Sequence, residues 1–128
     1  MKAYTDLEQS KTLAEILPTE SADMYYHPYP NDEDWYDIPN FGEADLKFNQ
    51  LPCWSLSALL DVIPVKSNGY KDMVIRLRMD KGDAGPDEYN LWYEDISTGV
   101  ATSLDVEADS FVDACVAMIE KLHEQKLL

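Results

Sequence analysis

Basic residues are scarce in this sequence, and their scarcity excludes several classes of function. Ten lysines and arginines stand against twenty-five aspartates and glutamates, so the formal net charge is −15. Binding to a phosphate backbone depends mainly on clustered Lys and Arg, so we expect no direct binding to nucleic acid. No apolar run approaches the ~20 residues that a membrane span needs, and we therefore expect no membrane partner.

Cysteine is equally scarce. Cys53 and Cys115 are the two cysteines, and their wide spacing matches neither a disulfide framework nor a zinc pattern. Residues 1–9 are polar and acidic, without the basic and then apolar pattern of a secretory signal. These features predict a cytoplasmic protein.

The length of 128 residues and the hydrophobic content of 45% predict a single domain, residues 1–128.

The segment from Ser110 to Leu122 has the clearest helical period. Apolar residues recur every three or four positions, which places a wide apolar stripe on one side of a helix. The stripe consists of Phe111, Val112, Cys115, Val116, Met118, Ile119 and Leu122. Asp109 or Ser110 can cap the start of this helix. So wide an apolar face needs a partner surface.

Two shorter helices are expected earlier in the chain. Thr5-Asp6-Leu7-Glu8 fits a capping box with Thr5 as the N-cap, and Pro18 ends the helix that follows. Ser55 is the expected N-cap of a central helix, which Pro64 ends.

Alternating apolar and polar residues predict the strands. Residues 22–26 form a short predicted strand, and residues 73–79, 88–96 and 100–107 alternate with short connections between them. That spacing predicts an antiparallel meander. Residues 27–50 contain prolines and an acidic run, so we expect an irregular loop there, which can form a short strand over residues 35–38. Its aromatic content predicts that it packs back on the body.

Together these elements predict an α+β fold. An antiparallel meander of three to four strands is expected to pack on the long C-terminal helix and on the short central helix, with an additional N-terminal helix. The order of elements in residues 55–122 resembles that of double-stranded RNA-binding domains. Such domains carry a basic cluster at the start of their last helix, whereas Glu107, Asp109 and Asp113 occupy that region here. We therefore expect no RNA binding from this topology.

Cys53 is the candidate nucleophile. It precedes the central helix, where the helix dipole and free N–H groups stabilise a thiolate. The string Cys53-Trp54-Ser55 resembles the nucleophile region of papain-like proteases, but the surrounding glycines are absent and the chain is too short for that fold. A nucleophile also needs a base, and only His27 and His123 are available. We expect Cys53 to be structural, with an enzyme as the alternative.

Two acidic groups raise the alternative of a metal site. They are Asp32, Glu33, Asp34 and Asp37 in one stretch and Asp80, Asp83 and Asp87 in another. Neither has the spacing of a calcium loop, so we expect solvated carboxylates, no metal and no cofactor. The first group, with Glu43 and Asp45, can also form an acidic array that mimics nucleic acid and binds a basic partner.

Trp92 is the aromatic residue that the strand pattern singles out. Alternation places Tyr89 and Tyr93 on one side of the middle strand and Trp92 on the other. If helices cover the first side, Trp92 faces outward beside Arg76 or Arg78, as at many protein interfaces. The alternative is that the N-terminal segment covers Trp92. The predicted partner-binding residues are Trp92, Arg76, Arg78, Trp35 and Tyr36.

Three stretches carry a resemblance to a known group of proteins. They are residues 3–26, Pro52–Pro64 (PCWSLSALLDVIP) and Asp113–Leu128 (DACVAMIEKLHEQKLL). In these stretches the chain resembles small acidic proteins of unknown function from gut bacteria and their mobile elements. The resemblance implies a compact domain and a phage or plasmid setting, and it carries over no catalytic residue.

The sequence predicts a small non-enzymatic protein that binds another protein. No phosphate-binding loop, dinucleotide fingerprint, hydrolase elbow or zinc-protease motif occurs. Two alternatives stay open. One is an acidic mimic of nucleic acid with a basic partner, and the other is a small enzyme that uses Cys53 or an acidic metal site.

Overall fold

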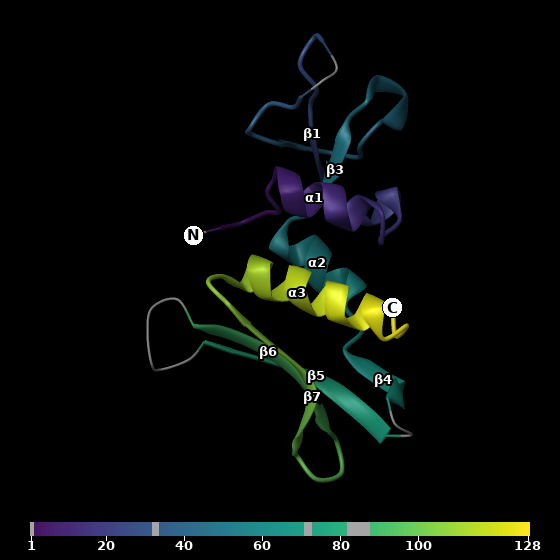
Figure 1. The fold of residues 1–128 in the computed structure, drawn as a ribbon, viewed down its shortest axis with the longest axis vertical. Helices are drawn as coiled ribbons and strands as arrows, with labels where there is room; N and C mark the ends of the chain where they lie inside the picture. Colours follow the sequence, from purple (N-terminus) through teal and green to yellow (C-terminus); the bar gives the residue numbers. More distant parts are fainter. Residues whose placement is uncertain (1, 32–33, 71–72, 82–87) are drawn as a thin grey trace. The chain divides into compact units, whose positions relative to one another are not determined.

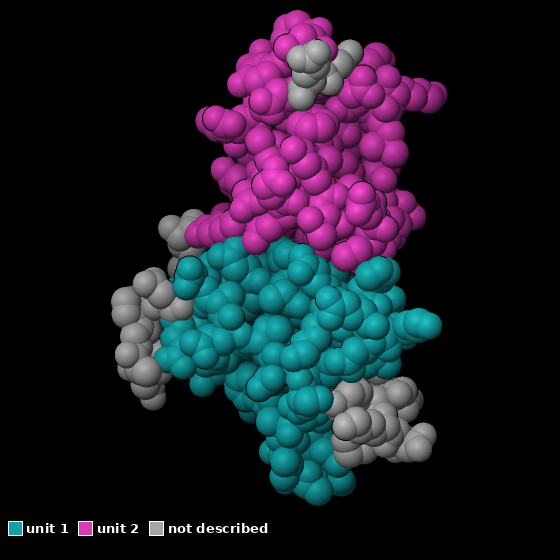
Figure 2. Space-filling model, in the orientation of Figure 1, with its two compact units in different colours: residues 1, 63–128 teal, residues 2–62 magenta. Residues whose placement is uncertain are grey.

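The computed structural model describes residues 2–31, 34–70, 73–81 and 88–128, and the side chains of residues 66–77 and 81 lie outside that description. The chain divides into two compact units, residues 2–62 and residues 63–128, which Figure 2 shows in different colours. Each unit contains helix and an antiparallel sheet, so the fold is α+β. The single domain of residues 1–128 stays a prediction.

The unit of residues 2–62 contains a sheet of three short strands in the order β2–β1–β3. Its elements are α1 (Leu7–Ala14), η1 (Thr19–Ser21), β1 (Met24–Tyr26), β2 (Asn40–Phe41), η2 (Leu46–Phe48), β3 (Leu51–Cys53) and α2 (Leu56–Val62). Both strand pairs are antiparallel. In β1, which lies within the predicted strand of residues 22–26, Met24 and Tyr26 are buried and Tyr25 is half-buried.

Helix α1 begins one residue later than predicted. Asp6 is its N-cap, because the Asp6 carboxylate accepts a hydrogen bond from the Gln9 backbone N–H at 2.8 Å. Gln9 Oε1 in turn accepts one from the Asp6 backbone N–H at 3.1 Å. The predicted Thr5 cap is therefore wrong. The Thr5 side chain is buried instead, and it forms hydrogen bonds with distant residues.

Helix α2 starts where the sequence predicts. The Ala58 backbone N–H donates to Ser55 Oγ at 3.2 Å, as expected for Ser55 in the N-cap position.

Residues 27–50 contain more regular structure than the predicted loop, namely β2 and η2. The strand suggested for residues 35–38 is replaced by an isolated bridge between Pro28 and Trp35. Trp35 packs against the buried core of this unit, so the stretch does fold back on the body.

The unit of residues 63–128 contains a four-stranded sheet in the order β4–β5–β6–β7, with each strand antiparallel to the next. The strands are β4 (Lys66–Tyr70), β5 (Met73–Lys81), β6 (Tyr89–Asp95) and β7 (Ala101–Ala108). Strands β5, β6 and β7 correspond to the three alternating segments. Strand β4 was not located from the sequence, because Lys-Ser-Asn-Gly-Tyr has no alternating apolar face.

Helix α3 (Phe111–Glu124) packs on β6 and β7, along one side of the sheet (Figure 1). Ser110 is its N-cap, with its hydroxyl accepting a hydrogen bond from the Asp113 backbone N–H at 3.0 Å. The buried residues of α3 are Val112, Ala114, Cys115, Val116, Met118, Ile119 and Leu122. Leu91 and Tyr93 of β6 and Leu104 of β7, the strands on which α3 packs, are fully buried. Packing of the meander on α2 stays a prediction.

Candidate functional site

Trp92 lies on the face of the sheet opposite helix α3. Tyr89 belongs to the helix side, because its ring meets that of Phe111 edge-on with centroids 4.7 Å apart. Leu91 and Tyr93 are fully buried on the same side. Successive residues of a strand point to opposite faces, so Trp92 points away from α3. Trp92 is half-buried, and we call this side of the sheet the outer face.

The strand register places charged residues on both sides of Trp92. Its partners across the sheet are Arg78 of β5 and Asp105 of β7. Arg78 Nε lies 3.5 Å from Glu94 Oε1, which orients the arginine along the same face. Lys121 of α3 donates to the Asp105 backbone carbonyl at 3.1 Å, and its Nζ lies 3.8 Å from Asp105 Oδ1. Trp92 therefore has a base on one neighbouring strand and an acid on the other.

A concavity of about 480 Å³ lies over the outer face. Its lining residues are Asp80, Asn90, Leu91, Trp92, Ala101, Asp105, Val106 and Glu107. This volume is within the range of roughly 300–1,000 Å³ that small-ligand sites occupy. The side chains of Asp80, Asp105 and Glu107 are exposed. The lining thus combines one large aromatic ring with three carboxylates.

The structure separates the predicted partner-binding residues into two groups. Trp92 and Arg78 lie opposite each other in the unit of residues 63–128. Trp35 and Tyr36 belong to the unit of residues 2–62. Arg76 pairs with Glu94 through the backbone, and its side chain lies outside the described part of the structure.

Sequence reasoning named Asp80 only as part of an acidic group and missed Asp105 and Glu107 as lining residues of the concavity. Asp105 and Glu107 alternate along β7 on the same side as Trp92, so their face was available from the pattern. Their pairing with β6 was not available from the pattern. The register of β6 and β7 shifts between the pairs Glu94–Ala101 and Trp92–Asp105, so the partner of Trp92 cannot be found by counting residues from the turn.

Trp35 fixes the stretch of residues 27–50 within its own unit. Its Nε1 donates to the Asn49 backbone carbonyl at 3.0 Å, and Lys11 Nζ lies 5.2 Å from its ring centroid. A second concavity, of about 400 Å³, borders the ring. Tyr36 is 45% exposed, and its ring lies edge-on to Tyr29 with centroids 4.4 Å apart. These contacts give Trp35 a structural role and leave Tyr36 accessible.

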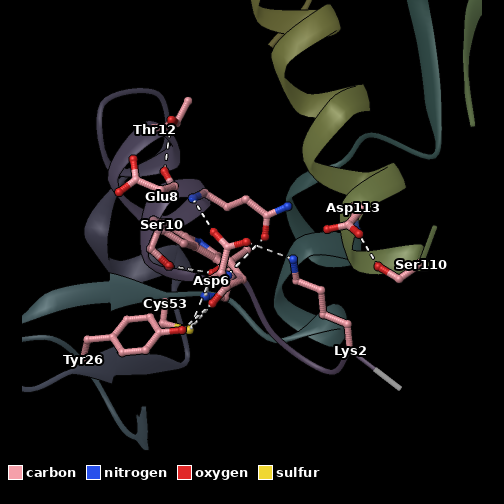
Figure 3. A network of polar contacts seen from close by, with 12 residues as sticks. Lys2, Asp6, Glu8, Ser10, Thr12, Tyr26, Cys53, Ser110 and Asp113 are labelled. Carbon is pink, nitrogen blue, oxygen red and sulfur yellow. Dashed lines mark hydrogen bonds and ion pairs between the residues drawn. The ribbon is translucent and has the colours of Figure 1, made fainter. Parts of the chain in front are cut away.

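Cys53 lies in a buried network of hydrogen bonds (Figure 3). Its thiol donates to the Thr5 backbone carbonyl at 3.4 Å, and the Thr5 hydroxyl lies within donating distance of the sulfur, at 3.5 Å. The Tyr26 hydroxyl donates to the same carbonyl at 2.7 Å, and Ser10 Oγ lies 2.8 Å from Thr5 Oγ1.

Burial determines the protonation of this thiol. Desolvation raises the pKa of Cys53, although hydrogen bonds with Thr5, Ser10 and Tyr26 partly oppose the shift. Cys53 is fully buried, as is Cys115, whose pKa burial raises to about 12. The thiolate is the nucleophilic form, so the surroundings of Cys53 favour the unreactive form. The predicted burial of Cys53 is confirmed, and its purely structural role stays a prediction.

The acidic groups do not converge among the described residues. Within those ranges, no three His, Cys, Asp or Glu side chains gather in an arrangement that holds a metal ion. The Asp34 carboxylate accepts from the Trp35 backbone N–H at 2.8 Å, and that of Asp45 from the Lys47 N–H at 3.0 Å. The residues of these groups that lie outside the description are Asp32, Glu33, Asp83 and Asp87.

No protein-family model, no curated protein and no solved structure matches this chain. The similarity to small acidic proteins of gut bacteria and their mobile elements therefore stays a prediction. None of the helices in the described part of the chain combines the length and the apolar composition of a membrane span.

Proposed function

We propose that this chain is a small non-enzymatic module that binds another protein through the outer face around Trp92. The observation that carries the proposal is the concavity of about 480 Å³ whose lining includes this half-buried tryptophan. Trp and Arg are enriched among the residues that contribute most to binding energy at protein interfaces. Trp92 and its cross-strand neighbour Arg78 provide both on adjacent strands of one sheet.

Exposed apolar side chains in the other unit support a binding role. Ile38, Phe41, Leu46 and Phe48 are between 60% and 82% exposed, and all four lie within one segment of eleven residues. Single exposed apolar residues are common, whereas groups of them mark interaction surfaces. Tyr36, a predicted partner-binding residue, lies two positions before this segment.

The proposal of a non-enzymatic protein is supported by the state of Cys53. An enzyme that used this thiol would need solvent access and a lowered pKa, and Cys53 has a buried side chain with a raised pKa. A cytoplasmic location is part of the same proposal. It is supported by the two cysteines, which are free and buried, as is usual in a reducing compartment.

An acidic mimic of nucleic acid is the second candidate function. It is favoured by the three carboxylates of the concavity, Asp80, Asp105 and Glu107, and by the net charge of −15. Such a mimic binds a basic partner, and its binding weakens steeply with salt because surface charges are screened over ~8 Å at physiological ionic strength. A partner that stays bound in high salt would exclude the mimic and leave the Trp92 interface.

The proposed interface is tested by affinity capture from the native host with a matched pair of variants. Trp92→Leu removes the aromatic ring from the concavity. Ile96→Ser is the control, because it removes an apolar side chain that is 42% exposed in the same unit but does not line the concavity. We expect a partner that wild type and Ile96→Ser retain and Trp92→Leu loses. Equal capture by all three proteins would contradict the proposal.

A further inference from the structure

We infer that the concavity over Trp92 binds a cationic side chain, an arginine or a lysine, that the protein partner presents. The inference rests on the proposed function and names the chemistry of the group that enters this site. It follows from the aromatic ring at the site, the positions of the carboxylates around it and the absence of a competing base among the described lining residues.

The aromatic ring supplies the first attraction. The indole of Trp is the best cation–π acceptor among protein side chains, and guanidinium groups stack on it. Trp92 belongs to β6, an interior strand of the sheet, with β5 on one side and β7 on the other. Because Trp92 is half-buried on the outer face, part of its surface stays open to a ligand.

The carboxylates lie on two successive rungs of the sheet. In one rung Trp92 pairs with Asp105, and in the next Asn90 pairs with Asp80 on one side and Glu107 on the other. Rungs on one face are two residues, or about 7 Å, apart, and adjacent strands are about 5 Å apart. Asp80 and Glu107 are therefore separated by about two strand spacings, roughly 10 Å, with the Trp92 rung beside them. Asn90 lies between them, so a guanidinium or ammonium group placed over Asn90 is about one strand spacing from each carboxylate.

The charge of the lining determines the sign of the ligand. Among the described residues that line the concavity, three are carboxylates and none is Lys, Arg or His. Arg78 lies across from Trp92 on the same rung but is not among the lining residues, and it is paired with Glu94. Lys121 reaches Asp105 from α3. An anionic ligand would meet like charge, and an apolar ligand would strip water from carboxylates without replacing their hydrogen bonds. A cation can form a cation–π contact with the Trp92 ring and ionic contacts with the carboxylates.

The inference is tested by NMR titration of the ¹⁵N-labelled chain with two peptides. One is Ac-Gly-Arg-Gly-Arg-Gly-NH₂, and the other carries citrulline, an uncharged isostere, in place of each arginine. We expect the arginine peptide to shift the Trp92 indole signal and the amides of residues 90–92 and 105–107. The citrulline peptide should bind at least about tenfold more weakly, since it lacks the charge that cation–π and ionic contacts require.

Variants separate the contribution of the Trp92 ring to peptide binding from that of the carboxylates. Trp92→Leu should weaken the arginine peptide by roughly three- to thirtyfold, whereas Ile96→Ser should leave its affinity unchanged. The double variant Asp105→Asn, Glu107→Gln preserves shape, and it should reduce both the affinity and the dependence of binding on salt. It serves as the second test should Trp92→Leu lose its folded spectrum.

Two results would overturn the inference. One is equal binding of the arginine and citrulline peptides, and the other is a set of shifts confined to residues 2–62. Either result refutes the cation site. If affinity capture nevertheless finds a partner that wild type retains and Trp92→Leu loses, the protein-binding function is left intact. A captured partner that Trp92→Leu retains would instead refute the Trp92 interface itself.

Discussion

Thr5 and Trp54 are joined by two hydrogen bonds although 49 positions separate them in the sequence. The Thr5 backbone N–H donates to the Trp54 carbonyl at 2.9 Å, and the Trp54 N–H donates to Thr5 Oγ1 at 3.1 Å. Both residues are fully buried. This pair fixes the chain before α1 to the end of β3, and it occupies the hydroxyl that the sequence assigned to a helix cap.

We predict that Thr5→Val destabilises the protein by about 1–3 kcal/mol. Valine preserves the shape of the side chain but leaves the Trp54 N–H and the Ser10 hydroxyl without their partner, and an unpaired buried polar group costs about that much. Thr5→Ser is the control, since it retains the hydroxyl and loses one methyl group. The measurement is urea unfolding, and equal stability of Thr5→Val and wild type would show that the network contributes nothing.

The start of α1 shows why one part of the fold was not readable from the sequence. Thr5-x-x-Glu8 and Asp6-x-x-Gln9 are both capping patterns one residue apart, and local propensity does not choose between them. The choice is made by Cys53 and Trp54, which bind Thr5 from far along the chain. Ser110 was readable as one of two candidate caps, beside Asp109, because a strong helical period follows at once.

The candidate site was predictable only in part, for a similar reason. The side of the strand on which Trp92 lies follows from alternation, and its neighbour is Arg78, one of the two arginines that the pattern allowed. The lining of the concavity also depends on which residues of β7 lie beside Trp92. An irregularity in the register of β6 and β7 determines that pairing. Strands β2 and β4 were missed because they are held by backbone pairing with β1 and β5 and have no apolar period of their own.

We predict that neither cysteine reacts faster than free cysteine at neutral pH. Both thiols are buried and their pKa values are raised, so the thiolate fraction and the access are both low. The measurement is labelling with a thiol reagent in the folded state and in urea, where the rate should rise to that of an unfolded peptide. Fast labelling of Cys53 in the folded protein would revive the enzyme alternative.

Stability should decrease above about pH 9. Burial raises the pKa of Cys115 from 9.0 to about 12, so the unfolded chain releases this proton at lower pH than the folded chain. The stabilisation is fully present below pH 9.0 and is lost as the pH rises towards 12, by at most about 1.4 kcal/mol per pH unit for each such group. Cys115→Ala should therefore give a shallower decrease between pH 9 and 11 in urea unfolding. An identical slope in the variant would contradict the assignment.

The apolar face of α3 is tested by a pair of charge substitutions. Leu122 is 1% exposed and Leu128 is 40% exposed. Leu122→Asp buries an unpaired charge and should cost more than about 3 kcal/mol, which unfolds many small domains. Leu128→Asp should retain the melting temperature of the wild type to within a few degrees. If Leu122→Asp melts like the wild type, the packing of α3 on the sheet is wrong.

The most direct test of the proposed interface is site-specific photo-crosslinking in the native host. A benzophenone side chain at Ala101, an exposed residue that lines the concavity, is compared with one at Glu15, an exposed residue of the other unit. We predict a discrete protein adduct from position 101 that disappears when Trp92→Leu is added. The proposed interface around Trp92 is contradicted if position 101 yields no adduct where position 15 does, or if the adduct persists unchanged with Trp92→Leu.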